Sequence, residues 1–147
     1  MGYLSDFVRA PLHTAKEVVA ADNPRSRWDG IEGPPGLETM HLARLWCLAT
    51  SKSSEDQFDA AEEQLSENYS EDNEGAWGVV LPQLFCQLLA GLRVAERDRL
   101  GQDWSVSEEI ILDGIAPEDI IRFLPNLCDL CQRAISHSEQ LILRVGE

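Results

Sequence analysis

The clearest reactive-site spacing in the chain is a C-x-x-C motif formed by Cys128 and Cys131. If a helix restarts at Pro125, Cys128 lies in its first turn, where the helix dipole lowers a thiol pKa and favours the nucleophilic thiolate. His137 could supply a third metal ligand and one of the two remaining cysteines a fourth, a ligand set that zinc accepts. A zinc or thiol-redox site at Cys128, Cys131 and His137 is therefore one hypothesis for this chain.

The same two cysteines also fit a hydrophobic core. A thiol-redox motif normally follows a strand in an α/β pattern, and no strong strand pattern precedes Pro125. Both thiols fall in the middle of an apolar helical face, where free Cys behaves as a small buried hydrophobe. We interpret Cys128 and Cys131 as packing residues, and we predict neither a bound metal nor another cofactor.

Residues 55–74 hold nine carboxylates and no Lys or Arg, and so carry most of the chain's net charge of −14. Such a concentration projects a negative potential that attracts basic partners and repels nucleic acid and anionic membranes. The segment does not match a metal site, because it lacks the Glu-x-x-His elements of helical di-metal proteins and the EF-hand ligand pattern. The predicted partner-binding carboxylates are Glu55, Asp59, Glu62, Glu63, Glu67, Glu71 and Asp72.

Charged side chains alone do not provide the water-free contact that holds a partner in place. We therefore predict that three aromatic residues also belong to the binding surface. Tyr69 lies inside the acidic segment, and Trp77 follows it between two glycines. Trp28 lies beside two arginines in the longest predicted loop. Trp, Tyr and Arg are common interface anchors. For Trp28, folding back into the core is an equal alternative.

His41 and Arg44 share a helical face with Leu37 and Leu48, so two polar groups point where apolar neighbours indicate burial. A lone buried charge is costly, and Arg44 therefore needs a carboxylate partner. We interpret these residues as a structural ion pair and a hydrogen-bonded histidine, with a polar pocket as the alternative. No Ser or Cys stands in a recognisable triad or elbow context, which favours a non-catalytic protein over an enzyme.

The composition is typical of an ordinary soluble globular domain, with 147 residues, 44% hydrophobic and 26% charged. Lysine occurs only at Lys16 and Lys52, and clustered cations of the kind that bind phosphate backbones are missing. No run of 18 apolar residues is present, which argues against a membrane span. The first residues lack a secretory pattern, so we expect a cytoplasmic protein whose cysteines are thiols.

Helical periodicity dominates the rest of the chain. Residues 1–20 predict one or two short helices broken near Pro11, followed by a long loop over 22–36. Further helices are predicted over 37–49, from a capping box at Ser54 onward, over 82–100, over 105–114 and from Pro117 onward. Pro125 should kink or divide the last of these. Residues 140–145 read either as one strand or as the end of that helix.

These elements predict a mostly α fold, a single helical domain over residues 1–147 with about five to seven helices and one optional short C-terminal strand. The leading functional hypothesis is non-covalent binding of a basic protein partner. In character, though in no motif, such a chain resembles immunity proteins that cap basic nuclease toxins, or mimics of nucleic acid. We predict no direct binding of nucleic acid or membrane and leave the oligomeric state open.

Overall fold

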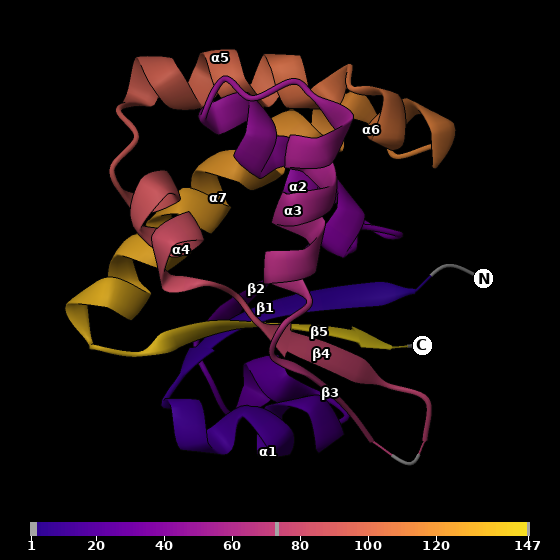
Figure 1. Ribbon diagram of the computed structural model, residues 1–147. Helices are drawn as coiled ribbons and strands as arrows, with labels where there is room; N and C mark the ends of the chain where they lie inside the picture. Colours follow the sequence, from indigo (N-terminus) through magenta and orange to yellow (C-terminus); the bar gives the residue numbers. More distant parts are fainter. Residues whose placement is uncertain (1–2, 73, 147) are drawn as a thin grey trace.

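Strands from distant parts of the sequence form the centre of an antiparallel sheet (Figure 1). The computed structural model describes residues 3–72 and 74–146. Strand β1 (Leu4–Ala10) pairs along its whole length with β5 (Gln140–Gly146). On one side β2 (Gly30–Glu32) pairs with β1. On the other side β4 (Trp77–Val80) pairs with β5 and β3 (Tyr69–Glu71) with β4, giving the order β2-β1-β5-β4-β3.

The prediction of a mostly α, all-helical bundle is therefore wrong, and the described chain has an α+β fold. Residues 4–10, which were expected to be helical, form β1, and residues 140–146 form the central strand β5. Both strands are covered on both faces, so they lose the alternating pattern of a half-buried strand. The neighbouring residues Phe7 and Val8 illustrate this, because both are fully buried but belong to different cores on opposite faces of the sheet.

The helices lie on both faces of the sheet, most of them on one face and α1 on the other (Figure 1). The described residues also form two 3-10 turns, Leu12–Thr14 and Pro24–Ser26. None of the helices in the described ranges is long and apolar enough to cross a bilayer. The α-helices are α1 (Ala15–Ala20), α2 (Thr39–Ala49), α3 (Glu55–Leu65), α4 (Gln83–Ala90), α5 (Val94–Ser105), α6 (Glu108–Leu112) and α7 (Pro117–Ser136).

The helices predicted over 37–49, after Ser54, over 105–114 and from Pro117 correspond to α2, α3, α6 and α7. The single helix predicted over 82–100 is wrong, because α4 ends at Ala90 and α5 begins at Val94. A new capping box starts α5, in which the Glu96 carboxylate accepts the Arg93 N–H at 2.9 Å. Pro125 lies inside α7 without dividing it.

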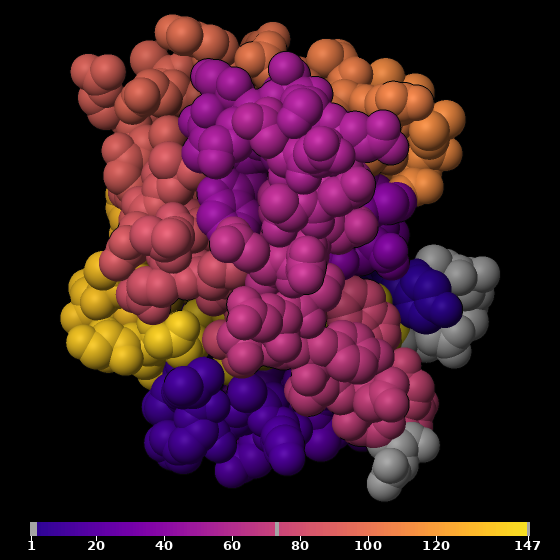
Figure 2. Space-filling model, viewed as in Figure 1, coloured from indigo at the N-terminus to yellow at the C-terminus, as the bar shows by residue number. Residues whose placement is uncertain are grey.

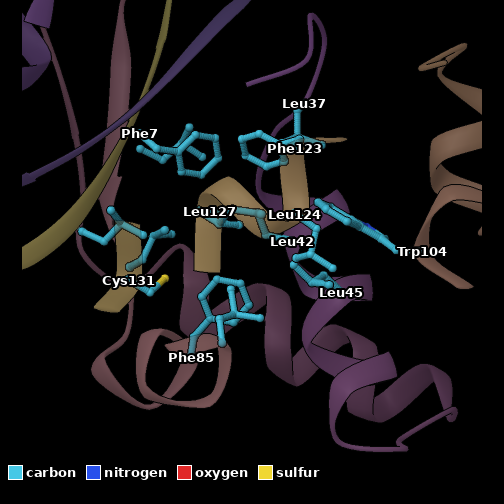
Figure 3. Close-up of a cluster of buried hydrophobic side chains, with 14 of the residues drawn as sticks. Phe7, Leu37, Leu42, Leu45, Phe85, Trp104, Phe123, Leu124, Leu127 and Cys131 are labelled. Atoms are coloured by element: carbon cyan, nitrogen blue, oxygen red, sulfur yellow. The ribbon is translucent and has the colours of Figure 1, made fainter. Parts of the chain in front are cut away.

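The larger core fills the space between the sheet and α2 to α7 (Figure 3). Phe7 of β1 faces Phe123 of α7 with ring centroids 5.2 Å apart, and Trp104 of α5 lies beyond Phe123 at 6.3 Å. A smaller core on the other face joins the sheet to α1; its buried members are Val8, Ala10, Val18, Val80 and Ile142. Residues of α2, α3, α7 and the sheet all belong to this larger core, so close packing positions α2 and α3 relative to the strands.

Candidate functional site

Helix α3 presents acidic residues to solvent because only one narrow stripe of it is apolar. Ser54 caps its start, since the Ser54 hydroxyl accepts the Gln57 N–H at 3.2 Å and the Gln57 side chain accepts the Ser54 N–H at 3.1 Å. Leu65 is buried, while Phe58 and Ala61 are half-buried against the core. This stripe packs against α2, and most of the remaining positions are exposed. The helix therefore offers an acidic outer face.

None of the nine carboxylates of residues 55–74 forms an ion pair with any residue that the structure describes. Seven of them are exposed, and Glu62 and Asp72 are half-buried. Eight of the chain's ten arginines pair with carboxylates outside this segment. Those arginines are Arg9, Arg25, Arg27, Arg44, Arg93, Arg97, Arg122 and Arg133. Within residues 3–72 and 74–146, no ion pair therefore neutralises the carboxylates of residues 55–74.

These nine carboxylates, called the acidic ridge below, come from elements that follow one another along one face of the molecule. Helix α3 runs down this face and leads into β3, the edge strand of the sheet (Figure 1). In the space-filling view the magenta to pink band of α3 and β3 crosses the face without interruption (Figure 2). Glu71 lies on β3, and a charge on an edge strand also discourages pairing with another sheet.

Two hollows lie along α3 and share part of their lining. The first is open, has a volume of about 570 Å³ and contains two carboxylates; it is lined by Ala60, Glu63, Gln64, Ser66 and Glu67. The second has a volume of about 200 Å³ between α2 and α3; it is lined by Trp46, Cys47, Thr50, Lys52, Gln57, Ala60, Ala61 and Gln64. An acidic hollow therefore adjoins one that has an aromatic wall.

The structure places two of the three predicted aromatic anchors beside the ridge. Tyr69 and Trp77 stack with ring centroids 5.9 Å apart and 29° between their planes. The exposed Tyr69 donates its hydroxyl to Glu71 at 3.0 Å, and this hydrogen bond raises the pKa of Tyr69. Trp28 instead precedes β2 at the opposite edge of the sheet, half-buried against the smaller core with the Arg27 guanidinium 4.4 Å from its ring centroid. Trp28 is not part of the ridge.

Arg44 of α2 forms the structural ion pair predicted from the sequence, and its guanidinium contacts both α6 and α3. Its guanidinium donates two hydrogen bonds to the Glu109 carboxylate of α6, at 2.8 and 3.1 Å. These bonds lower the pKa of Glu109 and raise that of Arg44. The guanidinium also lies over the Phe58 ring of α3, 4.5 Å from its centroid. Sequence reasoning predicted a carboxylate partner but not its identity, because α2 and α6 are far apart in the chain.

His41 is fully buried and hydrogen-bonded through both ring nitrogens, which confirms its structural role. Nδ1 accepts the Glu38 N–H at 3.0 Å, so this nitrogen carries no proton. Nε2 then holds the proton and donates it to Asp113 at 2.7 Å. With both nitrogens engaged, the imidazole caps the start of α2 and has no free nitrogen for proton transfer.

The C-x-x-C cysteines are buried in the larger core, as their packing interpretation predicts. Burial raises the pKa of Cys128 to about 11. A hydrogen bond with Cys86, followed by burial, raises the pKa of Cys131 well above its usual range. His137 is exposed beyond the end of α7, with Nδ1 2.8 Å from the Arg133 carbonyl oxygen.

Protonated, buried thiols are poor nucleophiles and poor metal ligands. Within the described ranges no three His, Cys, Asp or Glu side chains are arranged to hold a metal ion. The hypothesis of a zinc or thiol-redox site at Cys128, Cys131 and His137 therefore gains no support from the geometry.

Comparison with protein-family models, with curated proteins and with solved structures gives no match to this chain.

Proposed function

We propose that this protein binds a basic protein partner non-covalently through the acidic ridge. The observation that carries the proposal is that none of these nine carboxylates forms an ion pair with a described residue, while eight of the chain's ten arginines pair with other carboxylates. Folding gains nothing from leaving like charges crowded together, because exposed charges of one sign repel one another. A surface that retains this repulsion is suited to a partner of the opposite charge.

The two hollows along α3 suggest how such a partner would be held. A Lys or Arg side chain fits the open hollow beside Glu63 and Glu67, where its charge stays close to two carboxylates. A neighbouring apolar or aromatic side chain would enter the hollow beside Trp46 and supply the desolvated contact that exposed ion pairs lack. The stacked pair of Tyr69 and Trp77 adds a second apolar contact at the other end of the ridge.

The proposal describes a protein of the kind that masks a basic active or nucleic-acid-binding surface, as immunity proteins and nucleic-acid mimics do. It excludes direct binding of nucleic acid or anionic membrane at this surface, because both would be repelled. It also places the interaction in the cytoplasm, a reducing compartment that suits a chain whose four cysteines are free thiols.

A matched pair of charge reversals tests the proposal. Asp59→Lys with Glu63→Lys changes the ridge, whereas Asp98→Lys with Asp103→Lys changes exposed residues of α5 that form no ion pair with described residues. Each pair replaces two negative charges with two positive ones and so brings the net charge from −14 to −10. Immobilised wild-type protein and both variants are used to capture partners from a native lysate at about 0.05 M and about 0.5 M salt.

We expect the wild type and the α5 variant to retain the same basic protein at low salt and to release it at high salt. In a titration with that protein, the ridge variant should bind about 5- to 100-fold more weakly, because each reversed pair is worth about 1 kcal/mol. A partner that ignores salt, or that is lost equally with both variants, would contradict the proposal, as would the absence of any partner.

A further inference from the structure

Arg144 is a buried cation whose terminal nitrogens have no protein partner among the described residues. It lies on the central strand β5, and its residue surface is 8% exposed. Nε donates to the Val19 carbonyl oxygen at 2.8 Å and so caps the last turn of α1. None of the described acceptors bonds to Nη1 or Nη2, and no described carboxylate lies within 4.0 Å of the guanidinium. Nη1 and Nη2 are not fully buried and can donate to a ligand that enters from solvent, and a guanidinium that is mostly buried normally has an anionic partner.

The guanidinium borders a cavity of about 320 Å³ that three carboxylates also line. Its lining residues are Tyr3, Asp22, Asp72, Glu74, Gly75, Ala76 and Arg144. The site stays open partly because position 146 is glycine, since a Cβ there would lie 3.2 Å from Nη1 of Arg144. Asp72 is already engaged, because its Oδ1 accepts the N–H groups of Glu74 and Ala76 at 2.8 and 2.9 Å. Asp22 and Glu74 have no ion pair with a described residue.

This mixture of charges selects the class of ligand. A simple anion would meet the guanidinium but be repelled by three carboxylates, and a simple cation would meet the carboxylates but be repelled by Arg144. A molecule that carries both charges satisfies both sets of groups. We propose that the Arg144 cavity binds an amino acid with a cationic side chain, with its carboxylate on Arg144 and its cationic groups on Asp22 and Glu74. The planar guanidinium suits a carboxylate because it can donate two parallel hydrogen bonds.

The test compares L-arginine with agmatine, which is the same molecule without the carboxylate, by calorimetric titration of the full chain. If the cavity acted only as an acidic surface, agmatine would bind more tightly, because it carries more positive charge. If Arg144 holds the carboxylate, L-arginine binds at least about 10-fold more tightly than agmatine, because hydrogen bonds between charged groups are lost with the carboxylate. Acetate, which lacks the cation, should show no saturable binding.

Two variants locate the site. Arg144→Gln should abolish the preference for L-arginine over agmatine. Asp22→Asn, at an exposed position with no described ion pair, should keep the fold and weaken L-arginine binding about 5-fold or more. If Arg144→Gln does not fold, the ligand order of the wild type and the effect of Asp22→Asn decide the question. Agmatine binding as tightly as L-arginine, no saturable L-arginine binding, or unchanged binding by Asp22→Asn would each overturn the proposal.

This inference goes beyond the proposed function and does not depend on it. Its probe is a small molecule and its variants lie outside residues 55–74, so failure here leaves the charge-reversal test of the acidic ridge unaffected.

Discussion

Replacing Glu109 by Gln should destabilise the protein, because it breaks the ion pair with Arg44, whose guanidinium packs on Phe58 of the acidic helix α3. Glu109 and Arg44 have side chains that are only 14% and 24% exposed, and two hydrogen bonds join them. Removing the carboxylate leaves the Arg44 guanidinium partly buried without its partner. Breaking a fully buried pair costs about 3–5 kcal/mol, and exposed pairs are worth about 1 kcal/mol or less, so we expect about 2–3 kcal/mol here.

Urea unfolding followed by circular dichroism measures this loss, and a double-mutant cycle isolates the pair. Arg44→Met preserves most of the packing over Phe58 while removing the charge. The coupling energy between Arg44→Met and Glu109→Gln should be about 1–2 kcal/mol. For a chain of this length, the single Glu109 variant should melt about 5–10 °C lower than the wild type.

The effect of pH on this variant follows from the lowered pKa of Glu109. A carboxylate with a lowered folded pKa stabilises the protein above its unfolded pKa of about 4.3, and this contribution is lost as the pH falls through the folded value. The stability difference between wild type and Glu109→Gln should therefore be full at pH 7 and shrink below about pH 4. A coupling energy below about 0.5 kcal/mol, or a difference that does not change in acid, would refute the reasoning.

Three further predictions concern the core. Gly78→Ala should cost about 2–3 kcal/mol in urea unfolding, because its Cβ would lie 2.7 Å from both the Leu143 carbonyl oxygen of β5 and a Val19 methyl group of α1, and both elements would have to shift. Trp104→Phe removes the indole donor 2.9 Å from the His41 carbonyl oxygen and should cost about 2 kcal/mol or more in thermal unfolding. Burial raises the pKa of Cys128 to about 11, so its thiol stabilises the fold below about pH 8.5, and this contribution should disappear as the pH rises towards 11. The unfolding curves of wild type and Cys128→Ala should therefore converge between about pH 8.5 and 11.

Gly78→Ala has a matched control at another glycine. Gly36→Ala places a Cβ with no atom within 4 Å but at φ +86°, so it should cost less than Gly78→Ala and only through the backbone. Equal costs for the two glycine variants would show that β5 and α1 are not tightly packed around Gly78. Trp104→Phe stability within about 0.5 kcal/mol of wild type, or curves of Cys128→Ala and wild type that stay parallel at high pH, would contradict the other two predictions.

The helices were predictable because their signals are local. In α7, Ile120, Leu124, Leu127 and Cys131 recur at helical spacing and are all fully buried. Ser54 and Gln57 identify the start of α3 from four residues alone. The break between α4 and α5 was missed because the apolar residues of the two helices continue in nearly the same phase.

The sheet was not predictable in this way, because its central pairing joins residues 4–10 with 140–146. In β5, Leu141, Leu143 and Val145 face one core and Ile142 faces the other, so residues 141–143 form a continuous apolar run. Such a run identifies neither a partner strand nor a second covered face.

For the candidate sites too, features set by local sequence were predictable and features set by tertiary contacts were not. The exposure of the acidic ridge could be predicted from its composition, since a helix cannot bury so many unpaired carboxylates. The partners of Arg44 and His41 could not be predicted, because Glu109 and Asp113 approach them only in the tertiary structure. Arg144 was missed for the same reason, because its burial depends on α1 covering that face of the sheet.

The position of β5 between β1 and β4 has a consequence for how the protein is made. Without residues 140–146 the remaining strands form only two separate pairs, β1 with β2 and β3 with β4. A two-stranded pair is marginal in water, and its open edges invite aggregation. During synthesis the five-stranded sheet can therefore form only after residue 146 has left the ribosome, and until then the edges that β5 would cover stay open.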